Sequence, residues 1–465
     1  MAEKTSESDH LNSNTVLLWS IITMDKAVLT GPIIKTFLSY AIPSILGLLA
    51  ITTASIVDGI FVGQFVSAQG LAAINLLIPY LSLIFGLALM FSIGGAVRAG
   101  YYIGQKRFQS ASDVFSQCLL IIVVIGLGFL LFSWLFTDAI LLFLGTPTSI
   151  LTLIRPYFLI ISAVLLIQIS TMVMYYFIRQ DNAQTLASVA LISGAIINII
   201  LDAVFIIVFE WGLKGAAAAT AIAQTIQLIM LSRYFLRSQK KLTFSFIQHN
   251  KSEIKPVMFN GGSEFINEIS GGLVILILNW ILVSRLDVEG IAAFAVINYL
   301  IFISLMLYYG ISDALHLVAS QNYGARNTLR ISQFMLTAII GILCISISVT
   351  LCLLYFPEHI SSLFLDKTAE HTMQLSKHFI SLLWPLFLIN GVNVILSIYL
   401  TAIQKPIPSM AIALSRGLFL PIVLLLVLSW LLPEPEFLIA LPLSEWLTFL
   451  LAILLFIRYR PIKLD

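Results

Sequence analysis

The sequence has little charge: Asp, Glu, Lys and Arg make up 10% of its 465 residues, whereas a soluble domain carries about 25%. A soluble protein of this length needs more polar surface to cover its core, so a soluble enzyme or binding domain is excluded. The net charge of +2 also excludes the dense basic face that nucleic-acid binding requires. Hydrophobic residues make up 59% of the chain, and the excess over what a core needs must face something other than water, for which lipid is the natural candidate.

Cysteine and catalytic motifs are also scarce. The three cysteines, Cys118, Cys344 and Cys352, lie in apolar runs without CxxC spacing, which predicts three small buried side chains and no disulfide or metal site. No HExxH, GxSxG or paired-Asp protease signature is present, which argues against an intramembrane enzyme. The apolar stretch 15–24 is too short to span a bilayer and lacks a cleavage site, so no signal peptide is expected.

Twelve segments are long and apolar enough to be membrane helices, each with about 20 mainly apolar residues. They are 37–62, 70–97, 112–136, 150–177, 185–210, 213–235, 257–284, 290–321, 329–356, 375–402, 408–432 and 436–458. The sequence therefore predicts an all-α polytopic membrane protein.

The distribution of Lys and Arg predicts the orientation. Of the 25 basic residues, Arg416 falls within a span, 19 fall on the side of the N-terminus and five fall on the other side. Basic residues accumulate in cytoplasmic loops, so both termini are expected in the cytoplasm of a bacterial plasma membrane.

Short motifs recur between the two halves. Gly70–Ala73 returns as Gly290–Ala293, and the segment 102–106 returns as 322–326, both at an offset of 220 residues; segment 180–182 is matched to 404–406 at an offset of 224. Each half holds six spans, so the repeats are expected to be parallel and related by a pseudo-two-fold axis along the membrane normal. The expected organisation is a cytoplasmic tail (1–34), a first lobe (35–236), a basic cytoplasmic linker (237–256), a second lobe (257–459) and a cytoplasmic C-terminal tail (460–465).

The order and duplication of these motifs resemble the MATE family, the multidrug and toxic compound extrusion transporters. The motifs are Pro43 with Val57–Gly63, Gly70–Ala73, Gly94–Ala96, Gly262 with Glu268, and Asn322–Ala325. They most resemble the branch that contains the Staphylococcus-type and DNA-damage-inducible exporters. The resemblance implies a V-shaped fold of two six-helix lobes, alternating access driven by proton or sodium entry, organic cations as cargo, and a monomer.

Ionisable residues inside spans are costly and indicate function. Asn198 and Asp202 are four residues apart and share a helix face, and Asp58 is expected at a similar depth in the first lobe. Two carboxylates in a dry cavity do not both ionise readily, so one is expected to carry a proton. Asp58, Asn198 and Asp202 could instead bind Na+, and the resemblance places the ion site of this lobe at these positions; a structural hydrogen bond between helices is the alternative.

The sequence departs from the family pattern near the end of the fourth span. Many relatives carry Asn there, whereas this chain has Tyr175 and Tyr176, which weakens a sodium site more than a proton site. Gln168, two turns earlier, is a candidate replacement ligand.

A second polar cluster is expected in the other lobe. Glu264 and Glu268 share one face of span seven, and Asp313 and His316 share a face of span eight, where relatives more often show Gln. His316 is interpreted as a hydrogen-bonded residue rather than a metal ligand. Asn390 and Asn393 are expected to line a cavity or pack, Arg98 and Arg416 are expected to extend toward the headgroups, and Glu445 has no evident partner.

The resemblance implies a secondary transporter that exports organic cations or drugs by antiport. The residues of the spans favour the proton over sodium, no other cofactor is expected, and Pro43 is expected to be a hinge in the first span. The alternative within the same superfamily is a flippase of lipid-linked oligosaccharides. That function needs cationic residues for a pyrophosphate, whereas the spans carry mainly acids.

Overall fold

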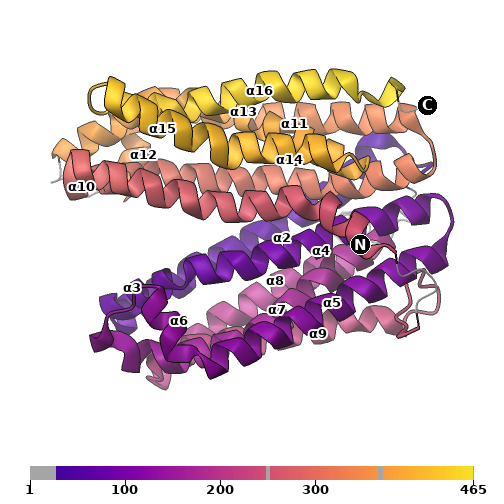
Figure 1. Cartoon of the computed structure of the whole chain (residues 1–465), viewed down its shortest axis with the longest axis horizontal. Coiled ribbons are helices and arrows are strands. Elements are labelled where there is room, and N and C mark those ends of the chain that lie inside the picture. Colours follow the sequence, from indigo (N-terminus) through magenta and orange to yellow (C-terminus); the bar gives the residue numbers. More distant parts are fainter. Residues whose placement is uncertain (1–27, 248–251, 365–369, 464–465) are drawn as a thin grey trace, which may run out of the picture.

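The computed structural model describes residues 28–247, 252–364 and 370–463, and all the regular secondary structure in these ranges is helical (Figure 1). The cytoplasmic tail expected at 1–34 lies outside the described residues up to residue 27. The elements of the first half are α2 (Ile33–Phe61), η1 (Val62–Val66), α3 (Ala68–Leu76), α4 (Ile78–Gly104), α5 (Phe108–Leu135), α6 (Thr137–Phe143), η2 (Thr148–Ile150), α7 (Leu151–Gln180), α8 (Gln184–Asp202), η3 (Ala203–Val208), α9 (Gly212–Ser232) and η4 (Arg233–Leu236). Those of the second half are α10 (Ile254–Gly324), α11 (Thr328–Tyr355), α12 (Pro357–Phe364), α13 (Glu370–Ala402), α14 (Pro406–Leu414), η5 (Ser415–Phe419), α15 (Leu420–Leu431), η6 (Glu436–Ile439), α16 (Ala440–Arg458) and η7 (Pro461–Lys463).

The prediction of twelve spans is confirmed, because the described chain contains 12 helical segments long and apolar enough to cross a membrane. The largest shift concerns the second span, which was expected at 70–97 and runs from Ile78 to Gly104. The segment Ala68–Leu76 is a separate short helix, capped by the Ser67 hydroxyl that accepts from the Gly70 amide at 2.9 Å. Proline is favoured in the first turn of a helix, and Pro79 accordingly lies in the first turn of α4.

The helix α10 comprises spans seven and eight and must fold back on itself. A straight helix of 71 residues would be about 107 Å long. Gly261 near one end of α10 packs on Met90 of α4, while Gly324 at the other end packs on Tyr101 of the same helix. Both ends of α10 therefore lie beside α4, and the two spans are antiparallel arms.

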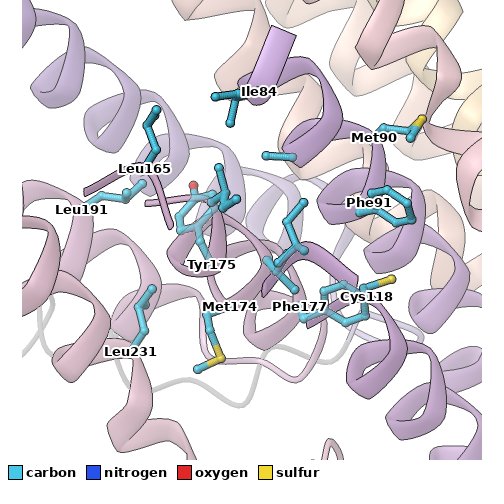
Figure 2. Packing of buried hydrophobic residues seen from close by; sticks show 14 of the residues in the cluster. Ile84, Met90, Phe91, Cys118, Leu165, Met174, Tyr175, Phe177, Leu191 and Leu231 are labelled. Atoms are coloured by element: carbon cyan, nitrogen blue, oxygen red, sulfur yellow. The ribbon is translucent and has the colours of Figure 1, made fainter. Parts of the chain in front are cut away.

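The helices form two bundles that follow the sequence, with the indigo-to-magenta first half in one and the salmon-to-yellow second half in the other (Figure 1). Figure 2 shows the core of the first bundle, in which Cys118 and Phe177 lie together. At the end of the molecule that contains Val28 and Tyr459, which we call the termini-bearing end, the start of α2 packs into a core of the second half. Cys344 and Cys352 are exposed, contrary to the sequence-based expectation, because they lie on the outer face of α11 where lipid replaces protein as the apolar neighbour.

The contacts between the halves are reciprocal. A Cβ atom on Gly104 would collide with the Gln321 carbonyl, and one on Gly324 would collide with the Tyr101 carbonyl; both pairs are related by the offset of 220 residues. Left-handed loop conformations also repeat, at Lys106 and Arg326. Such reciprocity is what a two-fold axis produces.

One proposed repeat is corrected by the backbone. Asn182 and Gln404 share positive φ values of 55° and 57°, and the following helices begin at Gln184 and Pro406. The offset in this region is therefore 222 residues and not 224. The sequence match was misleading because Gln180 and Gln404 are the same residue type in different positions of the loop.

The close approach of α4 and α10 yields a prediction. Gly104→Leu should lower the free energy of unfolding by about 1–3 kcal/mol, because the new side chain forces two helices apart where backbone meets backbone. Thermal unfolding in detergent measures this. Gly128→Leu is the matched control, since a Cβ there meets nothing within 4 Å; equal loss in both variants would contradict the prediction.

Candidate functional site

Two acidic side chains lie toward the end opposite the termini, on α2 and α8. Asp58 precedes the π-helix η1 by one turn, and Asp202 is the last residue of α8, directly before the π-helix η3. The helices α2 and α8 pack together, and η1 contacts η3. π-Helical turns are rare and frequent at functional sites, because the extra residue in the turn disturbs the regular ladder of backbone hydrogen bonds.

The two carboxyls have few polar partners. Asp202 is 0% exposed, and neither of its carboxyl oxygens has a hydrogen-bond partner within the described chain. One oxygen of Asp58 is buried in the same way, and this carboxyl lies within electrostatic range of Asp202. A buried carboxylate without a partner is costly unless it binds a proton or another cation. This pair is therefore suited to do either.

Tyr157 of α7 joins this pair, although no sequence motif indicated it. Its side chain is 6% exposed and lies within electrostatic range of both Asp58 and Asp202. The only sequence signal was a phenol in an apolar span. It contributes a third oxygen-bearing group on a third helix.

Of the other residues expected at this ion site, Asn198 lies on α8 one turn before Asp202, whereas Gln168 and Tyr175 lie elsewhere. The amide of Asn198 donates toward the Thr220 hydroxyl on α9 at 3.5 Å, the outer limit of a hydrogen bond. Gln168 and Tyr175 lie 11 and 18 residues beyond Tyr157 on α7, which corresponds to about 16 and 27 Å along the helix. Neither is placed to replace the asparagine of relatives, and Tyr175 packs on Arg179 instead, 4.8 Å from the guanidinium to the ring centre.

Sodium remains chemically compatible with the carboxyl oxygens of Asp58 and Asp202, because hard cations prefer oxygen ligands. Among the described residues, no group of three or more His, Cys, Asp or Glu side chains is arranged to hold a metal ion. Two carboxyls and a phenol fit a proton with no further ligand, whereas a sodium ion would also need other oxygens, such as those of Asn198 and its partner Thr220.

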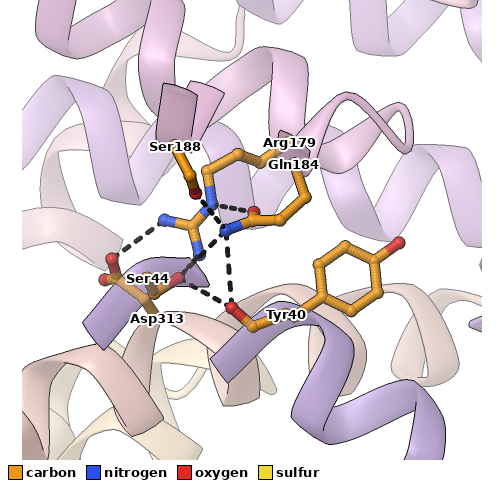
Figure 3. Close-up of polar contacts among 6 residues, drawn as sticks. All are labelled: Tyr40, Ser44, Arg179, Gln184, Ser188 and Asp313. Atoms are coloured by element: carbon orange, nitrogen blue, oxygen red, sulfur yellow. Dashed lines mark hydrogen bonds and ion pairs between the residues drawn. The ribbon is translucent and has the colours of Figure 1, made fainter. Parts of the chain in front are cut away.

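A second polar centre joins the two halves and is drawn in Figure 3. Arg179, at the end of α7, donates to the Asp313 carboxylate on α10 at 2.9 Å, and both side chains are buried, at 2% and 6% exposure. Arg179 also donates to the Gln184 side chain at 2.6 Å and to the Ser44 hydroxyl of α2 at 2.7 Å. This ion pair therefore connects three helices of the first half to the second half.

The acids of spans seven and eight are brought together only in part. Glu264 is buried within electrostatic range of Asp313, but the direct partner of Asp313 is Arg179 and not His316. His316 is 5% exposed, and neither ring nitrogen has a hydrogen-bond partner in the described part of the chain. The interpretation of His316 as a hydrogen-bonded residue is therefore wrong, because its expected partner Asp313 pairs with Arg179. Glu268, one turn beyond Glu264, is half-buried.

A third polar centre lies within the second half and gives Glu445 the partners that the sequence did not reveal. The Glu445 carboxylate accepts from Asn390 at 2.7 Å, from Asn393 at 2.7 Å and from Arg416 at 3.0 Å. Arg416 lies in the π-helix η5 and also donates to the Asn390 side-chain oxygen at 3.3 Å. The expectation that Arg416 extends toward the headgroups is wrong, because a buried carboxylate offers it a stronger partner than the interface does.

Arg98 is likewise paired. It donates to Glu253 at 2.7 Å and also to Gln404, and Tyr102 donates to the same carboxylate at 2.8 Å. Glu253 immediately precedes α10, so this cluster ties α4 of the first half to the start of the second at the termini-bearing end.

The buried centre around Glu445 yields a prediction. Arg416→Gln should lower the free energy of unfolding by about 3–5 kcal/mol, because it leaves a buried carboxylate unpaired, and Arg416→Gln combined with Glu445→Gln should recover most of the loss. Thermal unfolding of the wild type, the two single variants and the double variant in one detergent checks this. A double variant as unstable as the sum of the single changes would contradict the coupling.

Comparison with known proteins places this arrangement in a family. The MatE family model matches residues 43–204 and 273–427. The multidrug export protein MepA of Staphylococcus aureus is 21% identical over 78% of this chain and 80% of its own length. MepA of Staphylococcus saprophyticus is 24% identical over 57% of this chain, a match that spans 58% of the relative's length.

Solved structures share the fold. An outward-facing multidrug resistance MATE family transporter of the MOP superfamily superposes with a TM-score of 0.86 at 19% identity, covering 95% of this chain and 99% of that one. A variant of the Vibrio cholerae MATE transporter VcmN gives a TM-score of 0.84 at 18% identity, covering 92% and 97%. The twelve spans make this chain a multi-pass membrane protein. The family match covers more than half of the chain, so the chain belongs to the MatE family and is a secondary transporter.

Proposed function

We propose that this protein exports organic cations by antiport, and that the coupling ion is a proton bound at Asp58 and Asp202. The observation that carries the proposal is the buried Asp202 carboxyl, which has no hydrogen-bond partner in the described chain, beside the half-buried Asp58, one oxygen of which is likewise without a partner. The relatives named as multidrug export proteins support the cargo class. The excess of Lys and Arg on one side supports cytoplasmic termini in a bacterial plasma membrane, and a monomer is sufficient for this mechanism.

The helix α2 offers a route from the ion site to the contact between the halves. Asp58 lies near the C-terminal end of α2, and Ser44, which accepts from Arg179, lies 14 residues earlier, about 21 Å along the helix. Pro43 directly precedes Ser44 inside the helix and removes one backbone hydrogen bond, which favours bending at that point. Protonation of the Asp58–Asp202 pair removes the repulsion between the carboxyls, lets α2 repack on α8, and thereby moves Ser44.

The membrane potential is a sufficient driving force for the export of cargo against a modest gradient. Each elementary charge that crosses a potential of 100 mV contributes about 2.3 kcal/mol. A pyrophosphate-linked sugar is a less suitable cargo, because the guanidinium groups of Arg98, Arg179 and Arg416 are all paired with carboxylates. They therefore present no free positive charge for a pyrophosphate group.

Substitution at the ion site tests the proposal. Asp58→Asn should lower proton-driven ethidium efflux by at least about 10-fold while the protein remains folded, because the amide cannot release a proton. Efflux from proteoliposomes with an imposed pH gradient measures this. Asp138→Asn is the matched control, since Asp138 is an exposed partner of Arg155 at 3.3 Å. Full efflux by Asp58→Asn would refute the assignment.

The identity of the coupling ion has its own test. We expect an imposed pH gradient to drive ethidium efflux by the wild type and an equal sodium gradient to drive little efflux. The reason is that the carboxyl groups of Asp58 and Asp202 suit the binding of a proton. The two gradients are compared in the same proteoliposomes, with Asp202→Asn as the variant that should lose the response to pH. Efflux driven by sodium alone would overturn the proton assignment and leave the antiport mechanism intact.

A further inference from the structure

Arg179 is held by its own half of the molecule, independently of its ionic partner. Gln184 and Ser44 accept its hydrogen bonds at 2.6 and 2.7 Å. The rings of Tyr175 and Tyr176 lie 4.8 and 5.8 Å from the guanidinium carbon, within the range of a cation–π interaction. All four residues belong to the first half, so Arg179 stays with that half, and retains partners there, when the two halves move apart.

Asp313 is in the opposite position. It is 6% exposed, and Arg179 is the cation with which it pairs in the described chain. The buried arginine of its own half, Arg416, is occupied by Glu445 and Asn390. Glu264, within electrostatic range of Asp313, is another acid and offers no compensating cation. Separation of the halves therefore leaves Asp313 as a carboxylate without its ion-pair partner, which is unfavourable unless water or another cation takes the place of Arg179.

We infer that Asp313 has two alternative cationic partners: Arg179 while the halves are closed at the termini-bearing end, and the positive group of the cargo once they separate. This inference rests on the proposed function and names the residue that links cargo binding to opening. The cargo that this site recognises is a monovalent organic cation with N–H donors, because Asp313 supplies a carboxylate and Tyr176 supplies an aromatic face beside it.

The surroundings of the pair agree with a receptor for a cation. A narrow cavity lies at the ion pair and is lined by Tyr176, Arg179, Gln180, Asp313 and His316. The two ring nitrogens of His316 are buried without partners in the described chain, and in the neutral ring one of them can accept a hydrogen bond from a cationic ligand. The Asp313 carboxylate and this nitrogen give the second half two acceptors at the cavity, which matches a cation.

Exchange of partners couples the two events thermodynamically. A ligand shifts a conformational equilibrium only through its different affinity for the two states. The cargo binds Asp313 only when Arg179 has left it, so cargo favours the state that is open at the termini-bearing end. By reciprocity, weakening the hold of Arg179 must tighten cargo binding.

Equilibrium measurements without any ion gradient test the inference. Ethidium binding to the purified full chain is followed by fluorescence anisotropy, and opening is followed by the distance between spin labels at Phe108→Cys and Leu329→Cys, in the first turns of α5 and α11. The exposed Cys344 and Cys352 are replaced by Ser in this background. Asp138→Asn is the control, because it removes a carboxylate from an exposed ion pair.

The expected result differs between the two partners of the pair. Asp313→Asn should bind ethidium at least about 10-fold more weakly, with no lengthening of the label distance on addition of ethidium. Arg179→Gln should bind it several-fold more tightly and show the longer distance without ethidium. Asp138→Asn should match the wild type in both measurements.

Contrary results are equally distinct. Wild-type affinity in Asp313→Asn, or unchanged or weaker binding in a folded Arg179→Gln, would overturn the exchange of partners while leaving the proposed antiport intact. If Asp313→Asn does not fold, the ethidium affinity and label distance of Arg179→Gln alone decide whether the exchange of partners is upheld or overturned. Absence of ethidium binding by the wild type would contradict the proposed function itself.

Discussion

The structure depends on one constraint: a charge inside the lipid-spanning region must find a partner or be neutralised. Arg179 with Asp313, and Arg416 with Glu445, meet this constraint by ion pairing with additional hydrogen bonds. Asp58 and Asp202 do not, because the described chain brings no cation to them. The unmet requirement at Asp58 and Asp202 is what makes that site suited to a mobile ion, whereas the paired centres already contain their own cations.

The three polar centres have different relations to the two halves. The Glu445 centre lies within the second half and can persist unchanged when the halves move. The Arg179–Asp313 centre joins the halves and must break if they separate at that end. A buried salt bridge is in itself weak evidence for stability. The position of the Arg179–Asp313 pair between the halves is better explained if the pair breaks when the halves separate. The helix α2 connects this centre to the acidic pair, because it contains both Ser44 and Asp58.

Close backbone approach and polar pairing operate together at the termini-bearing end. The glycines at positions 94, 104, 261 and 324 allow α4 to lie directly on both arms of α10. Helices in membranes associate by such small-residue packing, since apolar burial gives no driving force there. The Arg98–Glu253 pair lies at this same contact and fixes its register. Packing thus brings the halves together and the ion pairs determine how they align.

The sequence by itself determined the class of protein, the twelve spans and the duplication, because hydropathy and the spacing of glycines are local properties that lipid enforces on each helix separately. It also indicated Asp58 and Asp202, since an acid in an apolar span is conspicuous whatever surrounds it. Only the tertiary structure decided which charges are paired, namely Arg416 with Glu445 and Arg179 with Asp313. It also decided that Tyr157 lies beside Asp58 and Asp202. Those partners lie on different helices, and their side chains meet only after the helices have packed in a particular rotation and depth, which no local pattern encodes.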